Sequence, residues 1–319
     1  MRVLVTGATG FVGRTLCTLL AERGHTVRAA LRVHRPMPEH IPECTIVGDI
    51  GANTSWDVAL DGVDAVVHLA ARAHILNDAS ENESLYVQAN TYGTESLATA
   101  AARTRVRRFI FLSSVKVNGE NSGDCAYTAF DEPHPEDAYG VSKCRAEKSL
   151  NGIAMQTGLQ VAIVRSPLVY GPGVRANFLR LLRWVDAGWP LPLGAIRNRR
   201  SLVSVWNLCD LLGNLLDNPA SVGTWMVSDG EDLSTPELIR EMARSMGRRV
   251  RLIPVPVGVL QASGSFLGKQ AEIARLCGSL AVDIAPTRAT LGWDPRIPLA
   301  EALSRTASWY LSEGRSHAF

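Results

Sequence analysis

The stretch that decides the fold is Arg2-Val-Leu-Val-Thr6 followed by Gly7-Ala-Thr-Gly10-Phe-Val-Gly13. Its first five residues form a short, mostly β-branched apolar run, which is typical of a buried strand. From Gly13 to Arg23 the apolar side chains recur at helical spacing instead. The glycines between strand and helix permit a tight turn and close approach of a pyrophosphate, and the start of the helix offers N–H groups to an anion. We therefore predict a nucleotide site at this turn.

The same alternation of strand and helix continues along the chain. Helical patterns such as Tyr92 to Ala102 separate further short apolar runs. Strands are predicted at 2–6, 26–31, 44–47, 65–69, 109–113, 161–165 and 224–227. This order predicts an α/β fold, with a doubly wound parallel sheet of Rossmann type. After about residue 170 the rhythm breaks, so we expect a nucleotide-binding domain at 1–170 plus about 201–228, and a smaller carboxyl-terminal substrate lobe at 171–200 and 229–319.

Composition excludes several other classes of protein. The chain has 319 residues, 46% of them hydrophobic, and its net charge of +2 is too small to favour nucleic acid as a partner. The six cysteines show no metal-like spacing, so we expect no zinc and no disulfide. Nothing resembles a signal peptide or a membrane span. We expect a cytoplasmic protein.

The end of the second predicted strand bears on the choice of cofactor. An acidic residue there binds the ribose 2′-hydroxyl of NAD, whereas an arginine accommodates the 2′-phosphate of NADP. This chain has Arg32, with Arg35 nearby, and no carboxylate. We therefore favour NADP(H) over NAD, with Arg32 as the first phosphate ligand, and expect Asp49 to meet the adenine. Solvated arginines are the alternative.

Three further residues form a candidate reacting centre. Ser114 follows a buried strand, and Tyr139 and Lys143 stand four residues apart on a predicted helix, where i and i+4 share one face. A nearby cation lowers the pKa of a phenol, which suits a general acid/base for an alcohol and ketone pair. We predict these three residues to be catalytic.

The glycine spacing GxxGxxG, Ser114 and the Tyr139-Gly-Val-Ser-Lys143 motif together resemble the extended short-chain dehydrogenase/reductases of the NAD-dependent epimerase/dehydratase family. The resemblance implies that Ser114 bonds the reacting sugar oxygen, Tyr139 exchanges its proton, and Lys143 holds the nicotinamide ribose. It also implies a set of cofactor contacts: Gly7, Gly10, Phe11, Val12, Gly13, Arg32, Asp49, Ile50, Leu69, Ala70, Ala71, Asn90, Tyr139, Lys143 and Pro167.

The resemblance likewise implies a diphosphate site for a UDP-sugar, formed by Asn177, Arg200 and Arg275. Arginine suits phosphate because its planar fork makes paired charge-assisted bonds. Lys116 and the pair Arg72 and His74 are candidates for sugar contacts, with exposed loop charges as the alternative. The segment Ser204-Val-Trp-Asn207 departs from the family, which commonly has a histidine before this valine and aspartates after it.

Three reactions are common in such enzymes. Dehydratases carry Asp-Glu after the catalytic hydroxyl residue, whereas Val115 and Lys116 stand here, so we reject dehydration. Because the second strand lacks an acidic residue, we favour reduction by NADPH. The segments 113–120, 191–194 and 197–202 resemble bacterial enzymes of surface-polysaccharide synthesis, and this resemblance implies a UDP-4-keto-6-deoxy-N-acetylhexosamine as substrate and a product such as UDP-N-acetylquinovosamine. The alternative is a UDP-hexose or UDP-N-acetylhexosamine 4-epimerase with bound NAD, and a remote one is a non-catalytic NADP sensor. Relatives are often homodimers, and we expect the same here.

Overall fold

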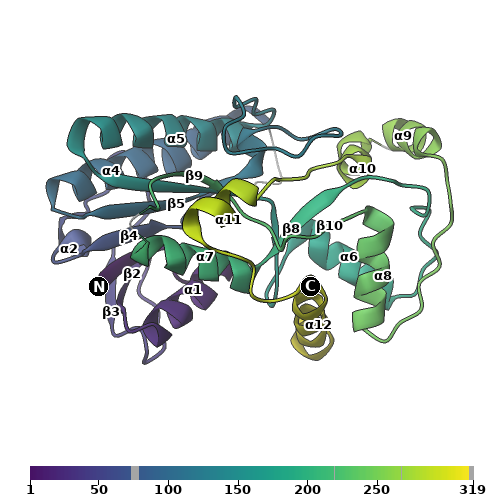
Figure 1. The fold of residues 1–319 in the computed structure, drawn as a ribbon, viewed down its shortest axis with the longest axis horizontal. Coiled ribbons are helices and arrows are strands. Elements are labelled where there is room, and N and C mark those ends of the chain that lie inside the picture. The colour runs from purple at the N-terminus through teal and green to yellow at the C-terminus, as the bar shows by residue number, and fades with distance from the viewer. Residues whose placement is uncertain (73–78, 219, 267, 316–319) are drawn as a thin grey trace.

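The computed structural model describes residues 1–72, 79–218, 220–266 and 268–315. Figure 1 shows a helix-covered sheet on one side and a smaller lobe, made from later parts of the chain, on the other. The two regions meet where β6 (Gln160–Ser166) passes into β7 (Leu168–Tyr170). Among the described residues, no helix is both long and apolar enough to span a membrane. The expected homodimer and cytoplasmic location stay predictions.

The larger sheet has seven strands in the order β3-β2-β1-β4-β5-β6-β9, all paired in parallel. The strands not yet given are β1 (Arg2–Thr6), β2 (Thr26–Leu31), β3 (Glu43–Ile46), β4 (Ala65–His68), β5 (Arg108–Ser114) and β9 (Gly223–Met226). The strand order reverses direction between β1 and β4. In open α/β sheets, ligands bind at the carboxyl ends of the strands beside such a switch point.

Helices cover both faces of this sheet. One face carries α2 (Asp57–Leu60), α4 (Gly93–Arg103) and α5 (Ala138–Thr157), and the other carries α1 (Phe11–Glu22) and α7 (Val205–Asp217). Each layer has its own apolar core, because the strands are buried on both sides: Leu97 and Phe109 belong to one core, Leu16 and Leu212 to the other. The predicted doubly wound Rossmann fold is confirmed.

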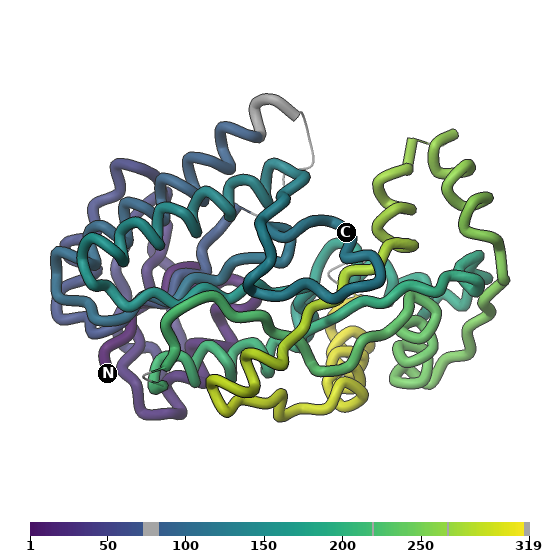
Figure 2. Tube along the Cα trace, turned by 45° about the horizontal axis from the view of Figure 1, so that its top comes forward, coloured from purple at the N-terminus to yellow at the C-terminus, as the bar shows by residue number. Residues whose placement is uncertain are grey.

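The lobe has a separate core and a three-stranded sheet, in which β8 (Arg200–Ser204) lies between β7 and β10 (Asp232–Leu233). Its helices are α6 (Ala176–Asp186), α8 (Thr235–Ser245), α9 (Val257–Phe266), α10 (Gln270–Cys277) and α12 (Leu299–Trp309). In Figure 2, α9 and α10 rise together from the rest of the lobe. The short helix α11 (Ala285–Leu291) returns to the larger sheet, where Leu291 and Trp293 enter its core.

The segment that follows β5 and the segment between α10 and α11 are joined by backbone hydrogen bonds. The Ser122 and Tyr127 amides donate to the carbonyls of Ser279 and Ala281, at 2.9 and 2.8 Å. The Ser201 amide, on β8, donates in turn to the Leu280 carbonyl at 3.0 Å. The segment after β5 is therefore held against the lobe through a strip of chain between α10 and α11.

Candidate active site

The glycine turn after β1 has a shape that side chains would destroy. Gly7 has φ +68°, and a Cβ built on Gly13 would lie 2.1 Å from the Gly7 carbonyl oxygen. A Cβ on Gly7 would lie 2.9 Å from the Ala70 amide nitrogen, after β4. Helix α1 then starts at Phe11 with no side-chain cap, which leaves its first N–H groups to an anion. This cradle fits the pyrophosphate of a dinucleotide.

The other predicted cofactor residues lie at the carboxyl ends of the same strands. Ile50 follows β3 and packs against α4, where a Cβ on Gly93 would clash with it. Pro167 is buried between β6 and β7, and Phe11 packs against both large cores. The structure thus places one continuous row along this edge of the sheet: Gly7, Gly10, Phe11, Val12, Gly13, Ile50, Leu69, Ala70, Ala71 and Pro167.

Arg32 and Asp49 lie at the outer end of this row and pair with each other. The Arg32 Nε lies 2.9 Å from the Asp49 carboxylate, and both side chains are at least three-quarters exposed. Such an exposed pair is weak and exchanges readily with solvent or ligand. A 2′-phosphate would therefore compete with Asp49 for Arg32.

His68 and Asn90 are buried and engaged within the protein. The Thr94 hydroxyl donates its one proton to the Asn90 carbonyl, at 2.6 Å. Its contact with His68 Nε2, at 3.0 Å, is therefore one in which the imidazole donates and the hydroxyl accepts. Burial, with a smaller effect of the Lys143 charge, lowers the pKa of His68 to about 3, so this imidazole is neutral. The Asn90 side chain bonds the Arg72 backbone at both N–H and C=O and donates to Ser142 Oγ on α5. Asn90 therefore fixes the loop after β4 against α5, whereas His68 links β4 to β1 and α4.

Ser114 ends β5 and faces the start of α5. Its Oγ accepts a hydrogen bond from the Lys116 amide at 3.3 Å, which caps a short 3-10 turn at Val115–Val117 and leaves the hydroxyl proton free to donate elsewhere. A Cβ on Gly140 would lie 2.7 Å from the Lys116 carbonyl oxygen, so this glycine lets the helix approach the turn closely. Asp137 caps α5 by accepting from the Gly140 amide at 2.7 Å.

Tyr139 lies in the first turn of α5, edge-on to the ring of Tyr86, with 6.1 Å between ring centroids. Burial, and after it the charge of Asp137, raises the pKa of Tyr139 above its ordinary value. The sequence argument expected a lowered pKa from the cation of Lys143, so the structure shows the opposite direction. In this structure the phenol is therefore neutral.

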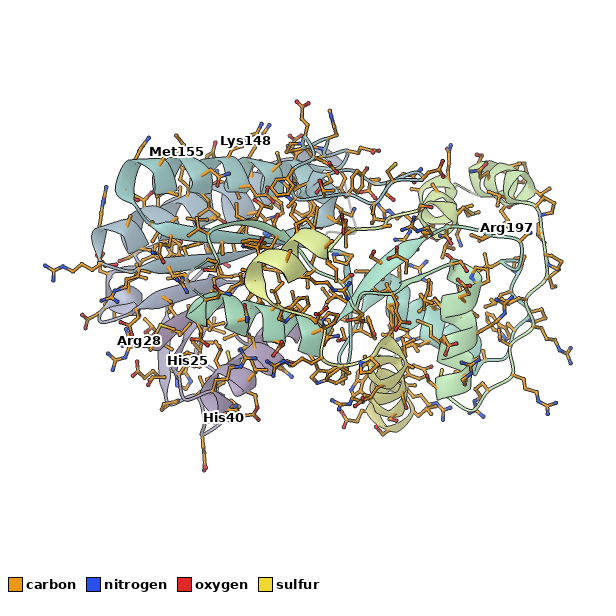
Figure 3. All side chains as sticks on the ribbon, in the orientation of Figure 1. His25, Arg28, His40, Lys148, Met155 and Arg197 are labelled. Atoms are coloured by element: carbon orange, nitrogen blue, oxygen red, sulfur yellow. The ribbon has the colours of Figure 1, made fainter. Side chains whose placement is uncertain are left out.

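Burial and the charge of Asp137, and not the cation of Lys143, set this direction, and the Lys143 amine has other partners. Its Nζ donates to the Leu112 carbonyl at 2.9 Å and lies 4.3 Å from the centroid of the Phe111 ring. Burial lowers the pKa of Lys143 to about 7, although the carboxylate of Glu147 partly opposes this. Figure 3 shows the opposite side of the helix, where Lys148 and Met155 project into solvent. Lys143 therefore lies on the sheet-facing side of α5, where its side chain is buried.

A buried ion pair beneath this centre was missed by the sequence argument. Arg165 Nη2 lies 2.7 Å from Glu147, one helical turn after Lys143, and both side chains are about 95% buried. Ser113 Oγ donates to the same carboxylate at 2.5 Å, and Arg165 Nη1 donates to Asn118 at 3.2 Å. Ser113 and Arg165 are register partners on β5 and β6, which explains the meeting. The only sequence signal was a charged residue at i+4 from Lys143.

Lys116 lies close to the start of α5 and is held by two carboxylates. Its Nζ contacts Asp137, the cap of α5, and donates to Glu120 Oε1 at 2.6 Å. The Glu120 carboxylate also faces Arg275 of α10, with 3.9 Å between Oε2 and Nε. The structure thus connects Lys116, predicted for the sugar, with Arg275, predicted for the diphosphate.

The predicted diphosphate residues come from three elements of the lobe. Arg200 Nη1 donates to the carbonyls of Arg275 and Gly278, at 2.6 and 3.1 Å, so these two arginines are neighbours. Asn177 is exposed in the first turn of α6, and Arg180, one turn later, pairs with Glu272 of α10 at 3.1 Å. Arg72 is exposed after β4, and His74 lies outside the described residues.

The lobe contains an apolar pocket of about 350 Å³. It lies between α9, α10 and the loop after α6, and is lined by Trp184, Trp189, Leu193, Leu260, Ile273 and Cys277, among others. Arg197, by contrast, projects from the outer edge of the lobe in Figure 3. Two of the lining residues, Leu276 and Cys277, follow Arg275 along α10. Within the described parts of the chain, no group of three His, Cys, Asp or Glu residues could hold a metal ion.

This fold and site define a nicotinamide-dependent enzyme with a Rossmann-type domain. The profile of the NAD dependent epimerase/dehydratase family matches residues 3–227, and the chain belongs to that family.

Similar proteins cover almost the whole chain. The UDP-glucose 4-epimerase of Vibrio cholerae is 42% identical over 97% of this chain and 95% of its own. The N-acetyl-alpha-D-glucosaminyl-diphospho-ditrans,octacis-undecaprenol 4-epimerase of Escherichia coli O157:H7 is 29% identical over 96% and 94%. A crystal structure of UDP-glucuronic acid 4-epimerase from Bacillus cereus in complex with NAD has a TM-score of 0.77, 22% identity, and coverage of 97% and 98%. This last likeness supports the fold.

Proposed function

We propose that this protein is a UDP-sugar 4-epimerase, which inverts carbon 4 of a UDP-hexose or UDP-N-acetylhexosamine with NAD retained on the enzyme. The observation that carries this proposal is the 42% identity with the Vibrio cholerae UDP-glucose 4-epimerase over nearly the full length of both chains. The sequence alone favoured reduction. This similarity reverses the order of the two candidates.

The site supports chemistry at one carbinol carbon. A nicotinamide cofactor held at the glycine turn would supply the hydride chemistry at carbon 4 of the sugar, accepting a hydride and returning it to the opposite face. Ser114 has a hydroxyl proton to donate to the oxygen on that carbon, and Tyr139, on the facing helix, exchanges the proton of the same oxygen. Lys143, four residues after Tyr139 on α5, would hold the ribose of the nicotinamide. Arg200 and Arg275 hold the diphosphate, and the apolar pocket of the lobe takes the base.

A second candidate is NADPH-dependent reduction of a UDP-4-keto-6-deoxy-N-acetylhexosamine. It is favoured by the end of β2, which has Arg32 where NAD-binding relatives carry a carboxylate.

One experiment separates the two. The purified protein is incubated with UDP-glucose, UDP-N-acetylglucosamine or their 4-epimers without added cofactor, and the products are followed by NMR. Interconversion of either pair supports the epimerase. If no pair interconverts, and NADPH is consumed faster than NADH with the 4-keto sugar, the epimerase proposal is wrong and the reductase takes its place. In that case Arg32→Ala should remove the preference for NADPH.

A further inference from the structure

Glu120 stands between the two parts of the substrate site. It lies in the loop after β5, and its side chain is about three-quarters buried. One carboxylate oxygen accepts from Lys116 at 2.6 Å, and the other faces Arg275 Nε at 3.9 Å. A single carboxylate therefore touches a cation of each region.

The contact with Arg275 is the weaker of the two. A distance of 3.9 Å is beyond that of a charge-assisted hydrogen bond, and about half of the Arg275 side chain is exposed. Arg200, which donates to the Arg275 carbonyl, adds a second positive charge nearby. Burial lowers the pKa of Arg200, and the negative charge of Glu120, the next largest influence, raises it. Glu120 thus acts on both arginines without being locked to either.

Lys116 does not depend on Glu120 alone. Asp137 contacts the same ammonium and is itself fixed as the cap of α5. Loss of the Glu120 charge would therefore leave Lys116 with a partner, whereas the arginines would lose the carboxylate that faces them.

We propose that Glu120 is an internal counter-ion of the diphosphate site, which the diphosphate of the substrate must displace from Arg275 before it binds fully. This inference rests on the proposed function, because it takes Arg200 and Arg275 as the diphosphate ligands. The internal anion weakens binding of the nucleotide diphosphate, and so favours release of the product. Its effect acts on the phosphates and leaves recognition of the base unchanged.

The test is titration calorimetry of the full chain with UDP and, separately, with uridine. Glu120→Gln keeps the shape and removes the charge, so we expect UDP to bind about threefold tighter or more, and this gain to shrink at high salt. Uridine should bind as before. Asp124→Asn is the matched control, because Asp124 is exposed in the same loop and carries the same charge.

Unchanged or weaker binding of UDP to the Glu120→Gln variant would overturn the internal counter-ion. Arg275→Ala distinguishes failure of the diphosphate site from failure of the role given to Glu120. If the unaltered protein binds UDP, Arg275→Ala weakens it and Glu120→Gln does not tighten it, the diphosphate site stands and only the role of Glu120 is lost. If the unaltered protein does not bind UDP, both are wrong.

Discussion

Tyr139 and Lys143 share one face of α5, yet each is tuned by the groups around it rather than by the other. Burial and Asp137 hold the phenol neutral, and the amine of Lys143 turns to the Leu112 carbonyl. The proposed chemistry requires the hydroxyl group of Tyr139. Lys143, by contrast, lowers the free energy of unfolding, and this effect can be measured separately.

For Tyr139→Phe we expect turnover to fall by about 10² to 10⁴, because the proton donor and acceptor at carbon 4 is removed. Cofactor binding should persist, since the ring remains and the glycine cradle is untouched. Turnover by NMR and cofactor affinity by fluorescence quenching check both halves. A variant with undiminished turnover would contradict the role given to Tyr139.

Lys143 should reduce the stability of the fold at neutral and acid pH. Its pKa in the folded protein, about 7, lies below the ordinary value of 10.5, so the unfolded chain binds the proton more tightly. Stability from this group is therefore lowest below pH 7 and rises as the pH increases from 7 to 10.5. Lys143→Met removes the penalty, and we expect it to be more stable than the natural protein at pH 6 by about 2 kcal/mol.

Urea unfolding of both proteins at pH 6 and at pH 9.5 checks this. The advantage of the methionine variant should shrink at the higher pH, where the natural lysine is neutral in the folded state. An advantage that is equal at the two pH values would show that packing, and not the proton, is responsible.

At the scale of elements, two glycines can be compared: Gly13 at the junction of β1 and α1, and Gly152 in the interior of α5. Gly13→Ala places a methyl group 2.1 Å from the Gly7 carbonyl oxygen, so the turn must shift, and we expect loss of cofactor binding and destabilisation by about 2 kcal/mol. Gly152 lies inside α5 with open space around it, and Gly152→Ala should instead stabilise by about 0.5–1 kcal/mol. Thermal melts with and without NAD distinguish the two, and equal effects would contradict the cradle.

The features that could be predicted from the sequence are those that depend on local patterns, and the features that could not depend on contacts between distant residues. The strands of the larger sheet and the glycine turn follow from local patterns, so β1 and β2 were predicted to the residue. The strand β10 has two residues, and β8 pairs with it only through contacts that cross the lobe. Neither β8 nor β10 was predicted as a strand from the sequence. Tyr139, Lys143 and Ser114 were recognisable as a motif, whereas Glu120 reaches Arg275 across 155 positions of sequence, a distance that no spacing rule covers.

At the scale of the whole molecule, the departure from the family at 204–207 joins the two regions. Asn207 donates to Asp229 at 2.7 Å and to the Ile297 carbonyl at 2.8 Å, and it accepts the Arg296 and Ile297 amides. Trp206 packs against the core of the sheet and the core of the lobe, and its ring lies 5.2 Å from the Arg305 guanidinium of α12. Trp206 and Asn207 thus stand where the family commonly carries aspartates, and Trp206 packs against both cores.

Trp206→Ala tests whether the two regions unfold as one. Truncation removes contacts to both cores and the stacked Arg305, so we expect a loss of about 2 kcal/mol or more and a lobe that unfolds before the sheet. Trp189→Ala is the control, because Trp189 is 61% exposed and its loss should cost less than about 0.5 kcal/mol. Urea unfolding followed by circular dichroism and by tryptophan fluorescence measures both. If the two probes still coincide in the Trp206 variant and its stability matches that of the control, the regions are joined mainly by the strip between α10 and α11, and Trp206 fills space without coupling them.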